Sequence, residues 1–209
     1  MSPNAEHPVA EPAVLLDKQA LRSQILTQRR SLAPQRDRAA DAAAIALAAS
    51  ALLDTLSGEH SAYGGQLCVA IYRALPSEPP TQALAEMLHA RKVTVIVPET
   101  LPDKDLDWRE LRADGSEGPA LGLAAIGAAQ AIMAPAMAVD HSGTRLGKGG
   151  GCYDRALARR RPDAVVVALV NDDEYSAWPL PRDAHDVPVN AVITPGCGLS
   201  PIPGAGSAG

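Results

Sequence analysis

The stretch GTRLGKGGGCYDRAL, residues 143–157, combines the residue types that bind anions. Arg145 and Lys148 supply positive charge, and the glycines from Gly147 to Gly151 let backbone N–H groups converge on one point. The helix formers that follow bring the partial positive charge of a helix N-terminus to the same place. The pattern therefore predicts a site for a phosphate or another anion, and a flexible surface turn is the alternative.

This stretch matches neither of two common phosphate-binding motifs. In the P-loop, four residues separate the glycines and Ser or Thr follows the lysine. Here three residues separate Gly143 from Gly147, and Gly149 follows Lys148. Cys152 takes the place of the third glycine in the dinucleotide-binding pattern GxGxxG. Phosphate binding therefore has to come from another kind of loop.

Composition limits the classes of protein to which the chain can belong. Its 209 residues are 46% hydrophobic and 21% charged, which fits one domain with a full core. A net charge of −5 provides no overall positive field for nucleic acid or an anionic membrane. Cys68, Cys152 and Cys197 lack the spacing of a disulfide framework or a zinc site. With neither a signal peptide nor an apolar run of about 18 residues, we expect a soluble, cytoplasmic protein.

The elements that must position the glycine-rich stretch follow from hydrophobic periodicity. Apolar residues at helical spacing predict two opening helices, within residues 14–30 and 39–56. Strand patterns then alternate with helical ones: strands at 66–72, 93–99, near 139, at 164–170 and 190–194, with helices at 81–92 and 149–160. This alternation predicts an α/β fold, a three-layer αβα single domain with a largely parallel sheet and two N-terminal helices.

The limits of the domain follow from composition. Residues 1–13 and 195–209 are rich in small residues and proline, so we expect flexible tails around a domain of residues 14–194. Residues 104–112 alternate as a half-exposed edge strand does, and residues 113–130 fit a loop or a short helix equally well. The glycine-rich stretch follows a strand and precedes a helix, which is where open α/β sheets bind ligands.

The same stretch resembles GxRLGxGxGYYDR, the signature of the 5-formyltetrahydrofolate cyclo-ligase family, also called the 5,10-methenyltetrahydrofolate synthetases. Three further segments resemble motifs of that family in the same order: KQALR at 18–22, IYRALPSEPPT at 71–81 and HDVPVNAVIT at 185–194. The resemblance implies an ATP- and Mg²⁺-dependent reaction that converts 5-formyltetrahydrofolate to 5,10-methenyltetrahydrofolate and releases ADP and phosphate. In the mechanism that the resemblance implies, the formyl oxygen would attack the γ-phosphate, and N10 of the folate would then close the ring.

The resemblance also implies a role for each matching residue. Arg145 and Lys148 would be catalytic, because they offset the charge that builds in phosphoryl transfer. The implied ATP contacts are Lys18, Arg22, Arg145, Leu146, Gly147, Lys148, Gly149, Gly150, Gly151, Cys152 and Tyr153. The implied folate contacts are Arg73, Glu78, Lys148, Gly149, Gly150, Gly151 and Cys152. Asp154 and Asp186 would be the Mg²⁺ ligands.

Each of these roles has a structural alternative. Lys18, Arg22 and Arg73 could instead be charged residues on a solvated surface. Asp154 could be an acid that a helix N-terminus favours, and Asp186 could be a turn residue. His185 fits a structural hydrogen-bonding role.

The chain also departs from the family pattern. Cys152 replaces the first tyrosine of the usual pair, Asn190 replaces an aspartate, and residues 113–130 lack the expected landmarks. Trp108 and Tyr72 are the aromatic candidates for stacking on the folate, with packing in the core as the alternative. These departures motivate a second hypothesis, a non-catalytic nucleotide- or folate-binding homologue. A phosphosugar isomerase or transferase is a third. We expect small-molecule ligands and a monomer.

Overall fold

The computed structural model describes residues 17–60, 66–183 and 186–203. The predictions for the tail of residues 1–13 and for His185 lie outside these residues. The two predicted N-terminal helices are confirmed as α1 (Lys18–Leu32) and α2 (Arg38–His60), joined by a short 3-10 helix η1 (Ala33–Gln35). Asp17 caps α1, since its Oδ1 accepts from the backbone N–H groups of Gln19 and Ala20 at 2.8 Å each.

The central sheet confirms the predicted α/β class. Among the described residues its strands run in the order β11-β10-β8-β5-β1-β2-β3-β4. The five inner strands, from β10 to β2, are parallel, and antiparallel strands flank them. The strands are β1 (Cys68–Ala70), β2 (Thr94–Thr100), β3 (Leu106–Leu111), β4 (Glu117–Ala120), β5 (Ala131–Pro135), β8 (Val165–Leu169), β10 (Ala191–Thr194) and β11 (Gly198–Pro201).

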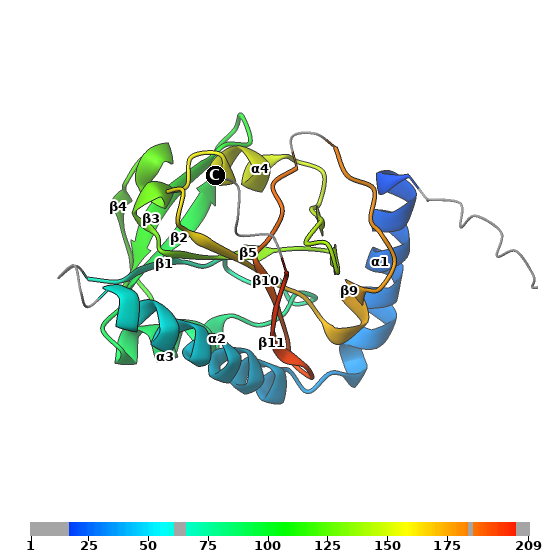
Figure 1. Ribbon diagram of the computed structural model, residues 1–209, viewed down its shortest axis with the longest axis horizontal. Coiled ribbons are helices and arrows are strands. Elements are labelled where there is room, and N and C mark those ends of the chain that lie inside the picture. Colours follow the sequence, from blue (N-terminus) through cyan, green and yellow to red (C-terminus); the bar gives the residue numbers. More distant parts are fainter. Residues whose placement is uncertain (1–16, 61–65, 184–185, 204–209) are drawn as a thin grey trace, which may run out of the picture.

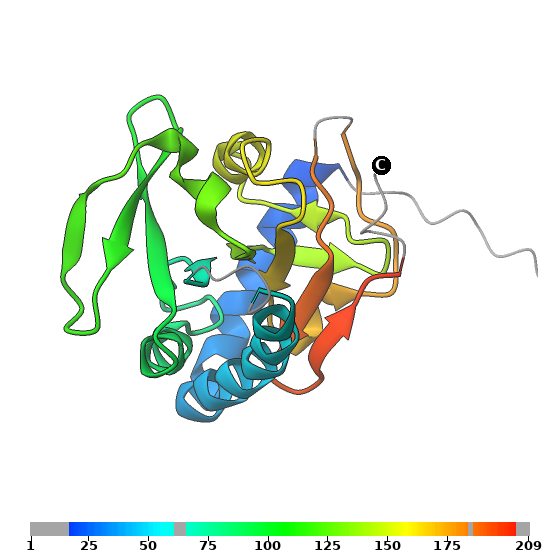
Figure 2. The same cartoon turned by 60° about the vertical axis from the view of Figure 1, so that its left-hand side comes forward.

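Helices cover both faces of this sheet (Figures 1 and 2). On one face, α2 and α3 (Gln82–Ala90) pack on a cluster that includes Val69 and Met133. On the other, α4 (Cys152–Leu157) and the 3-10 helix η2 (Leu123–Ala128) pack on a cluster that includes Ala70 and Ile132. Neighbouring residues of a strand belong to opposite clusters because side chains alternate across a sheet. The result is the expected three-layer arrangement.

Several predicted elements differ from the structure. Residues 104–112 are not an edge strand, since β4 pairs with β3 on its outer side and Trp108 is fully buried. Residues 113–130, which fitted a loop or a short helix equally well, contain β4 and η2. The helix predicted at 149–160 shortens to α4, because Gly149 and Gly151 have φ values of +94° and +66° that interrupt a right-handed helix.

The predicted flexible tail of residues 195–209 is wrong for residues 198–201. These residues form β11, which pairs antiparallel with β10 at the edge of the sheet. The Gly- and Pro-rich composition of residues 195–209 hid this strand, because pairing through backbone hydrogen bonds needs no particular side chains.

The second helix also differs from expectation in its hydropathy. Residues 38–56 of α2 are long and apolar enough, by length and composition, to cross a membrane, whereas no such stretch was expected. Alanine accounts for much of this character. Ile45, Ala49 and Leu53 are fully buried against the sheet and α3, so in this fold α2 is a packing helix.

A small second sheet joins the central sheet to the glycine-rich stretch. It consists of β7 (Arg145–Leu146), β6 (Ala138–Asp140) and β9 (Tyr175–Ser176), the last following a short 3-10 helix η3 (Asp172–Glu174). Asp140 closes the β6–β7 hairpin: its Oδ1 accepts from Ser142 N at 2.8 Å and Thr144 N at 3.0 Å. Its Oδ2 accepts from Leu180 N at 2.7 Å.

The pKa of Asp140 predicts an acid-dependent loss of stability. Burial acts to raise that pKa, but hydrogen bonds from Leu180, Ser142 and Thr144 outweigh burial and lower it. The stabilisation is therefore complete above the ordinary Asp pKa of about 3.9 and is lost as the pH falls through the lower folded value. We expect Asp140→Asn to reduce the free energy of unfolding by about 1–3 kcal/mol at pH 7. The variant should lose less further stability than wild type between pH 4 and pH 2.5, measured by urea unfolding.

Asp54→Asn is the control for this prediction, because Asp54 pairs with Arg91 at an exposed position. It should change the stability at pH 7 by no more than about 0.5 kcal/mol. A pH dependence for Asp140→Asn equal to that of wild type would contradict the assigned role.

Candidate functional site

A cavity of ≈ 460 Å³ opens at the carboxyl ends of β1, β2 and β5. Tyr72, Thr100 and Pro135 line it from these three strand ends, the glycine-rich stretch forms a second wall, and α1 forms a third. This confirms the expected position at the carboxyl edge of a parallel sheet. The strand expected near Val139 proves to be β6 of the small sheet. The glycine-rich stretch therefore begins inside the β6–β7 hairpin and contains β7, instead of following a central strand.

Every residue to which the family resemblance gave a role in binding or catalysis lines this one cavity. They come from four distant segments: Lys18 and Arg22; Arg73 and Glu78; the continuous run from Arg145 to Asp154; and Asp186. Their roles toward ligands stay predictions, because the structure brings the residues together without showing what they bind.

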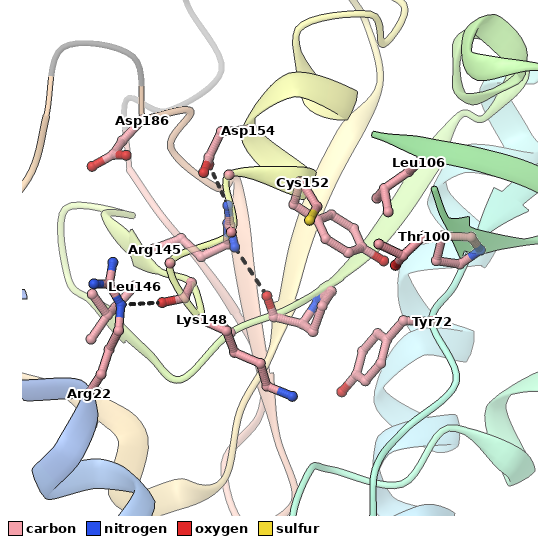
Figure 3. A pocket seen from close by; sticks show the side chains of 18 of the residues that line it. Arg22, Tyr72, Thr100, Leu106, Arg145, Leu146, Lys148, Cys152, Asp154 and Asp186 are labelled. Carbon is pink, nitrogen blue, oxygen red and sulfur yellow. Dashed lines mark hydrogen bonds and ion pairs between the residues drawn. The ribbon is translucent and has the colours of Figure 1, made fainter. Parts of the chain in front are cut away.

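The glycine-rich loop holds a conformation that requires glycine at two positions. Gly149 has φ +94°, and a Cβ there would lie 3.3 Å from Cζ of Arg22. Gly151 has φ +66° at the start of α4. Arg22 also donates from Nε to the carbonyl of Gly147 at 2.8 Å. The loop therefore passes close to α1, and Arg22 binds the loop backbone directly instead of lying on a solvated face (Figure 3).

Arg145 is a buried cation at the base of the loop. Its Nη2 lies 2.5 Å from Oδ1 of Asp154, and its Nη1 donates to the carbonyl of Pro135 at 3.3 Å. Its Cζ lies 5.9 Å from the centre of the Tyr153 ring, a cation–π arrangement. Among the described residues, its Nε has no hydrogen-bond partner. Figure 3 shows the paired side chains of Arg145 and Asp154.

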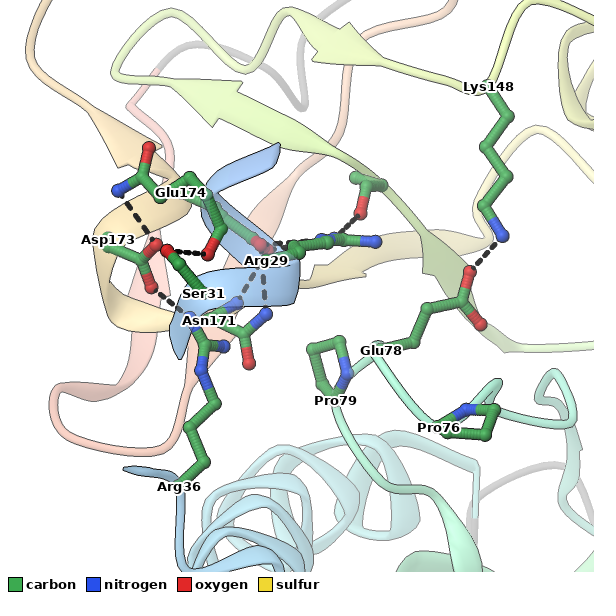
Figure 4. A network of polar contacts seen from close by, with 12 residues as sticks. Arg29, Ser31, Arg36, Pro76, Glu78, Pro79, Lys148, Asn171, Asp173 and Glu174 are labelled. Atoms are coloured by element: carbon green, nitrogen blue, oxygen red, sulfur yellow. Dashed lines mark hydrogen bonds and ion pairs between the residues drawn. The ribbon is translucent and has the colours of Figure 1, made fainter. Parts of the chain in front are cut away.

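Lys148 and Glu78 form an ion pair between two walls of the cavity. Nζ of Lys148 lies 2.6 Å from Oε1 of Glu78, whose side chain is only 4% exposed (Figure 4). The other carboxylate oxygen accepts from Leu75 N at 2.8 Å. Arg38 of α2 donates to the carbonyl of Glu78 at 2.9 Å and so holds the turn that presents it.

Lys18 pairs with two carboxylates at the far end of the cavity. Its Nζ lies 2.7 Å from Oδ2 of Asp183 and 2.5 Å from Oδ2 of Asp186. Burial acts to lower the pKa of Lys18, but hydrogen bonds and charge attraction from the two aspartates raise it above its usual value. Lys18 is therefore charged at neutral pH and neutralises part of this acidic end.

The carboxylates fit a Mg²⁺ ion that is bound together with phosphate. The described residues contain no group of three or more His, Cys, Asp or Glu side chains able to hold a metal. Asp154 and Asp186 nevertheless line the same cavity as the cationic loop. Since Mg²⁺ often takes one or two carboxylates and completes its shell with water and phosphate oxygens, this donor set fits a metal that arrives with a nucleotide.

The remaining predicted contacts have mixed outcomes. Arg73 pairs with Glu117 of β4 while still lining the cavity. Tyr72 lines the cavity but is buried, its hydroxyl donates to the Pro79 carbonyl at 3.2 Å, and burial raises its pKa well above the ordinary value. Trp108 is a core residue, as the packing alternative proposed.

The two single-residue departures lie in different places. Cys152 lines the cavity, and its side chain is labelled in Figure 3. Asn190 does not line it. Its Oδ1 accepts from Val166 N at 2.7 Å, which ties the start of β10 to β8. The departure at Asn190 therefore affects contacts within the sheet, whereas the departure at Cys152 changes the lining of the cavity.

Sequence reasoning missed several residues of the site. Asp183, Leu75, Thr100 and Leu106 line the cavity, and Arg38 holds the turn of Glu78 from outside. Asp183 lies three residues before the predicted ligand Asp186, and this short spacing could have indicated that both aspartates belong to the site. Leu75 lies inside the segment 71–81 that resembles a family motif. Thr100, Leu106 and Arg38 carry no local signal, because only the packing of distant segments brings them to the site.

The fold and the site define an α/β enzyme with a cationic, glycine-lined cavity at the carboxyl edge of its sheet. The model of the 5-formyltetrahydrofolate cyclo-ligase family matches residues 15–195. The chain is 34% identical over 197 residues to the 5-formyltetrahydrofolate cyclo-ligase of Mycolicibacterium smegmatis, covering 87% of this chain and 95% of that protein. It therefore belongs to the 5-formyltetrahydrofolate cyclo-ligase family.

Solved structures share the fold. The 5,10-methenyltetrahydrofolate synthetase of Aquifex aeolicus superposes with a TM-score of 0.64 at 22% identity, covering 90% of this chain and 94% of that chain. The synthetase of Mycoplasma pneumoniae gives a TM-score of 0.61 at 18% identity, covering 85% of this chain and 98% of that chain. The predicted family and fold class are thus confirmed.

Proposed function

We propose that the chain converts 5-formyltetrahydrofolate to 5,10-methenyltetrahydrofolate, using ATP with Mg²⁺ and releasing ADP and phosphate. The observation that carries this proposal is the 2.6 Å ion pair between Lys148 and Glu78. It joins the loop expected to bind phosphate to the turn expected to bind the folate, inside one cavity. A reaction between a nucleotide phosphate and a folate requires both ligands to be held close together, because positioning of the reactants contributes much of the rate enhancement.

The proposed roles of the side chains follow from their charge and burial. Glu78, buried and paired with Lys148, accepts hydrogen bonds from N–H groups of the pterin ring. Arg145 and Lys148 stabilise the negative charge on the γ-phosphate while the formyl oxygen attacks it. Backbone N–H groups of the glycine loop orient the phosphate oxygens. Attack by N10 then closes the ring and expels phosphate.

The proposed metal site consists of Asp154 and Asp186. A Mg²⁺ ion bound there with ATP would neutralise phosphate charge. Asp154 is kept in place by Arg145 and Asp186 by Lys18, so both carboxylates are held in defined positions at the cavity wall. The predicted monomeric state and cytoplasmic location stay predictions.

The direct test is turnover of the purified chain. 5-Formyltetrahydrofolate, ATP and Mg²⁺ should give the near-ultraviolet absorbance of the methenyl product together with one phosphate per product. ATP and folate binding without absorbance would instead support a non-catalytic binding homologue. Binding of a phosphosugar with no ATP requirement would support the isomerase or transferase hypothesis.

Replacing Lys148 should separate turnover from stability. We expect Lys148→Ala to lower kcat by on the order of a hundredfold or more, as the loss of comparable electrostatic donors does. Lys148→Arg keeps the charge and should retain more activity than the alanine variant. Because Glu78 loses its partner, thermal unfolding of each variant shows whether the protein is still folded at the assay temperature. A wild-type kcat for Lys148→Ala would rule out a catalytic role.

Replacing Asp154 should weaken the Mg²⁺ dependence. Asp154→Asn removes one anionic ligand, so the Mg²⁺ concentration for half-maximal rate should rise by about tenfold or more. Asp163→Asn is the matched control, because Asp163 pairs with Arg161 through an arginine–carboxylate contact of 2.6 Å outside the cavity. A Mg²⁺ titration of Asp154→Asn that overlays wild type would leave Asp154 as an acid favoured by its helix N-terminus.

A further inference from the structure

Arg29 is one of two buried residues of α1 and lies outside the cavity. Within this helix only Ile25 and Arg29 are buried. Ile25 contributes to a small apolar cluster with Met137, Ala138 and Leu146. A helix that buries so little apolar surface is oriented chiefly by its polar contacts, and a buried guanidinium requires strong partners.

The partner of Arg29 is a carboxylate that is itself held in place. Nε of Arg29 lies 2.6 Å from Oε1 of Glu174, and Nη2 lies 2.8 Å from Oε2. The two side chains are 1% and 2% exposed. Glu174 also accepts from the backbone N–H and from Nδ2 of Asn171 at 2.9 Å each (Figure 4). This two-point contact fixes both the distance and the orientation of Arg29.

Arg29 also contacts the backbone of the cavity wall. Its Nη2 donates to the carbonyl of Ala136 at 2.7 Å. The preceding carbonyl, that of Pro135, accepts from Nη1 of Arg145 at 3.3 Å. Ala136 and Pro135 both line the cavity. Arg29, outside the cavity, and Arg145, inside it, therefore bind consecutive carbonyl groups in the segment that connects β5 to β6.

The position of Arg29 along α1 links it to the nucleotide contacts. Lys18, Arg22, Ile25 and Arg29 follow at intervals of four, three and four residues, so they share one face of the helix. Lys18 and Arg22 line the cavity from this face. Rotation or tilt of α1 at Arg29 would therefore move both side chains relative to the glycine loop.

We propose that Arg29 is a positioning residue of the nucleotide site. Bound by Glu174, it sets how α1 presents Lys18 and Arg22, and it supports the wall that holds Arg145. It acts through these three residues and does not touch the ligand. The inference rests on the proposed function in one respect, since that proposal makes a nucleotide the ligand of Lys18 and Arg22.

The test removes the two-point contact without leaving a buried charge unpaired. The double variant Arg29→Met with Glu174→Gln is neutral at both positions, and the amide oxygen still accepts from Asn171 N. We expect its Kd for a non-hydrolysable ATP analogue with Mg²⁺ to rise about tenfold or more, measured by calorimetry. Its Kd for 5-formyltetrahydrofolate should rise less than its Kd for the nucleotide analogue, because Leu75 and Arg38 still hold the turn of Glu78.

Arg36→Met is the matched control. Arg36 pairs with Asp173 at 2.5 Å, and so joins the same two regions of the chain, but it does not line the cavity. Its Kd for the nucleotide analogue should equal that of wild type. Arg29→Lys keeps the charge without the planar two-point geometry and should give an intermediate Kd.

The outcomes separate this inference from the proposed function. Wild-type nucleotide affinity in the folded double variant, or an equal loss in Arg36→Met, overturns the positioning role. If the double variant does not fold, wild-type nucleotide affinity in Arg29→Lys overturns it instead. A wild-type protein that binds the analogue but gives no methenyl product would count against the proposed reaction alone.

Discussion

The cavity depends on one constraint, that the cations placed in it have polar partners within contact distance. Arg22 donates to the Gly147 carbonyl, and the others pair with carboxylates. Arg145 is paired with Asp154, Lys148 with Glu78, and Lys18 with Asp183 and Asp186. Because a buried, unpaired charge is strongly unfavourable, these pairs let the protein concentrate positive charge at the edge of a sheet without a ligand. The same pairs determine where each charge stands before any ligand arrives.

The fold supplies this arrangement by bringing short polar segments to one edge. The parallel strands β1, β2 and β5 end beside each other, and each continues into a segment that lines the cavity. The small sheet then turns the chain back, so that the glycine loop faces these strand ends and α1. Apolar packing on both faces of the central sheet holds the scaffold rigid, while the polar contacts at its edge orient the functional side chains.

The departures from the family pattern make sense in this arrangement. Asn190 serves the backbone of β8 and β10, where an amide oxygen accepts a hydrogen bond as a carboxylate does. Cys152 is different, because it replaces an aromatic ring at the cavity wall beside Tyr153. The chain keeps the second aromatic ring next to Arg145, and so keeps the cation–π contact that borders the loop.

The sequence by itself determined the α/β class, the two opening helices, the glycine loop and part of the set of residues that meet in the cavity. These follow from periodicity, glycine content and motifs, which are local properties of the chain. It did not reveal β11, which lies in a segment rich in Gly and Pro, or the burial of Trp108 in the cluster with Ile126 and Leu157. The tertiary structure alone decided which charges pair, since Arg29 and Glu174 are 145 residues apart and Lys18 and Asp186 are 168 apart. An ion pair depends on distance in space, and at such separations the packing of the whole sheet sets that distance.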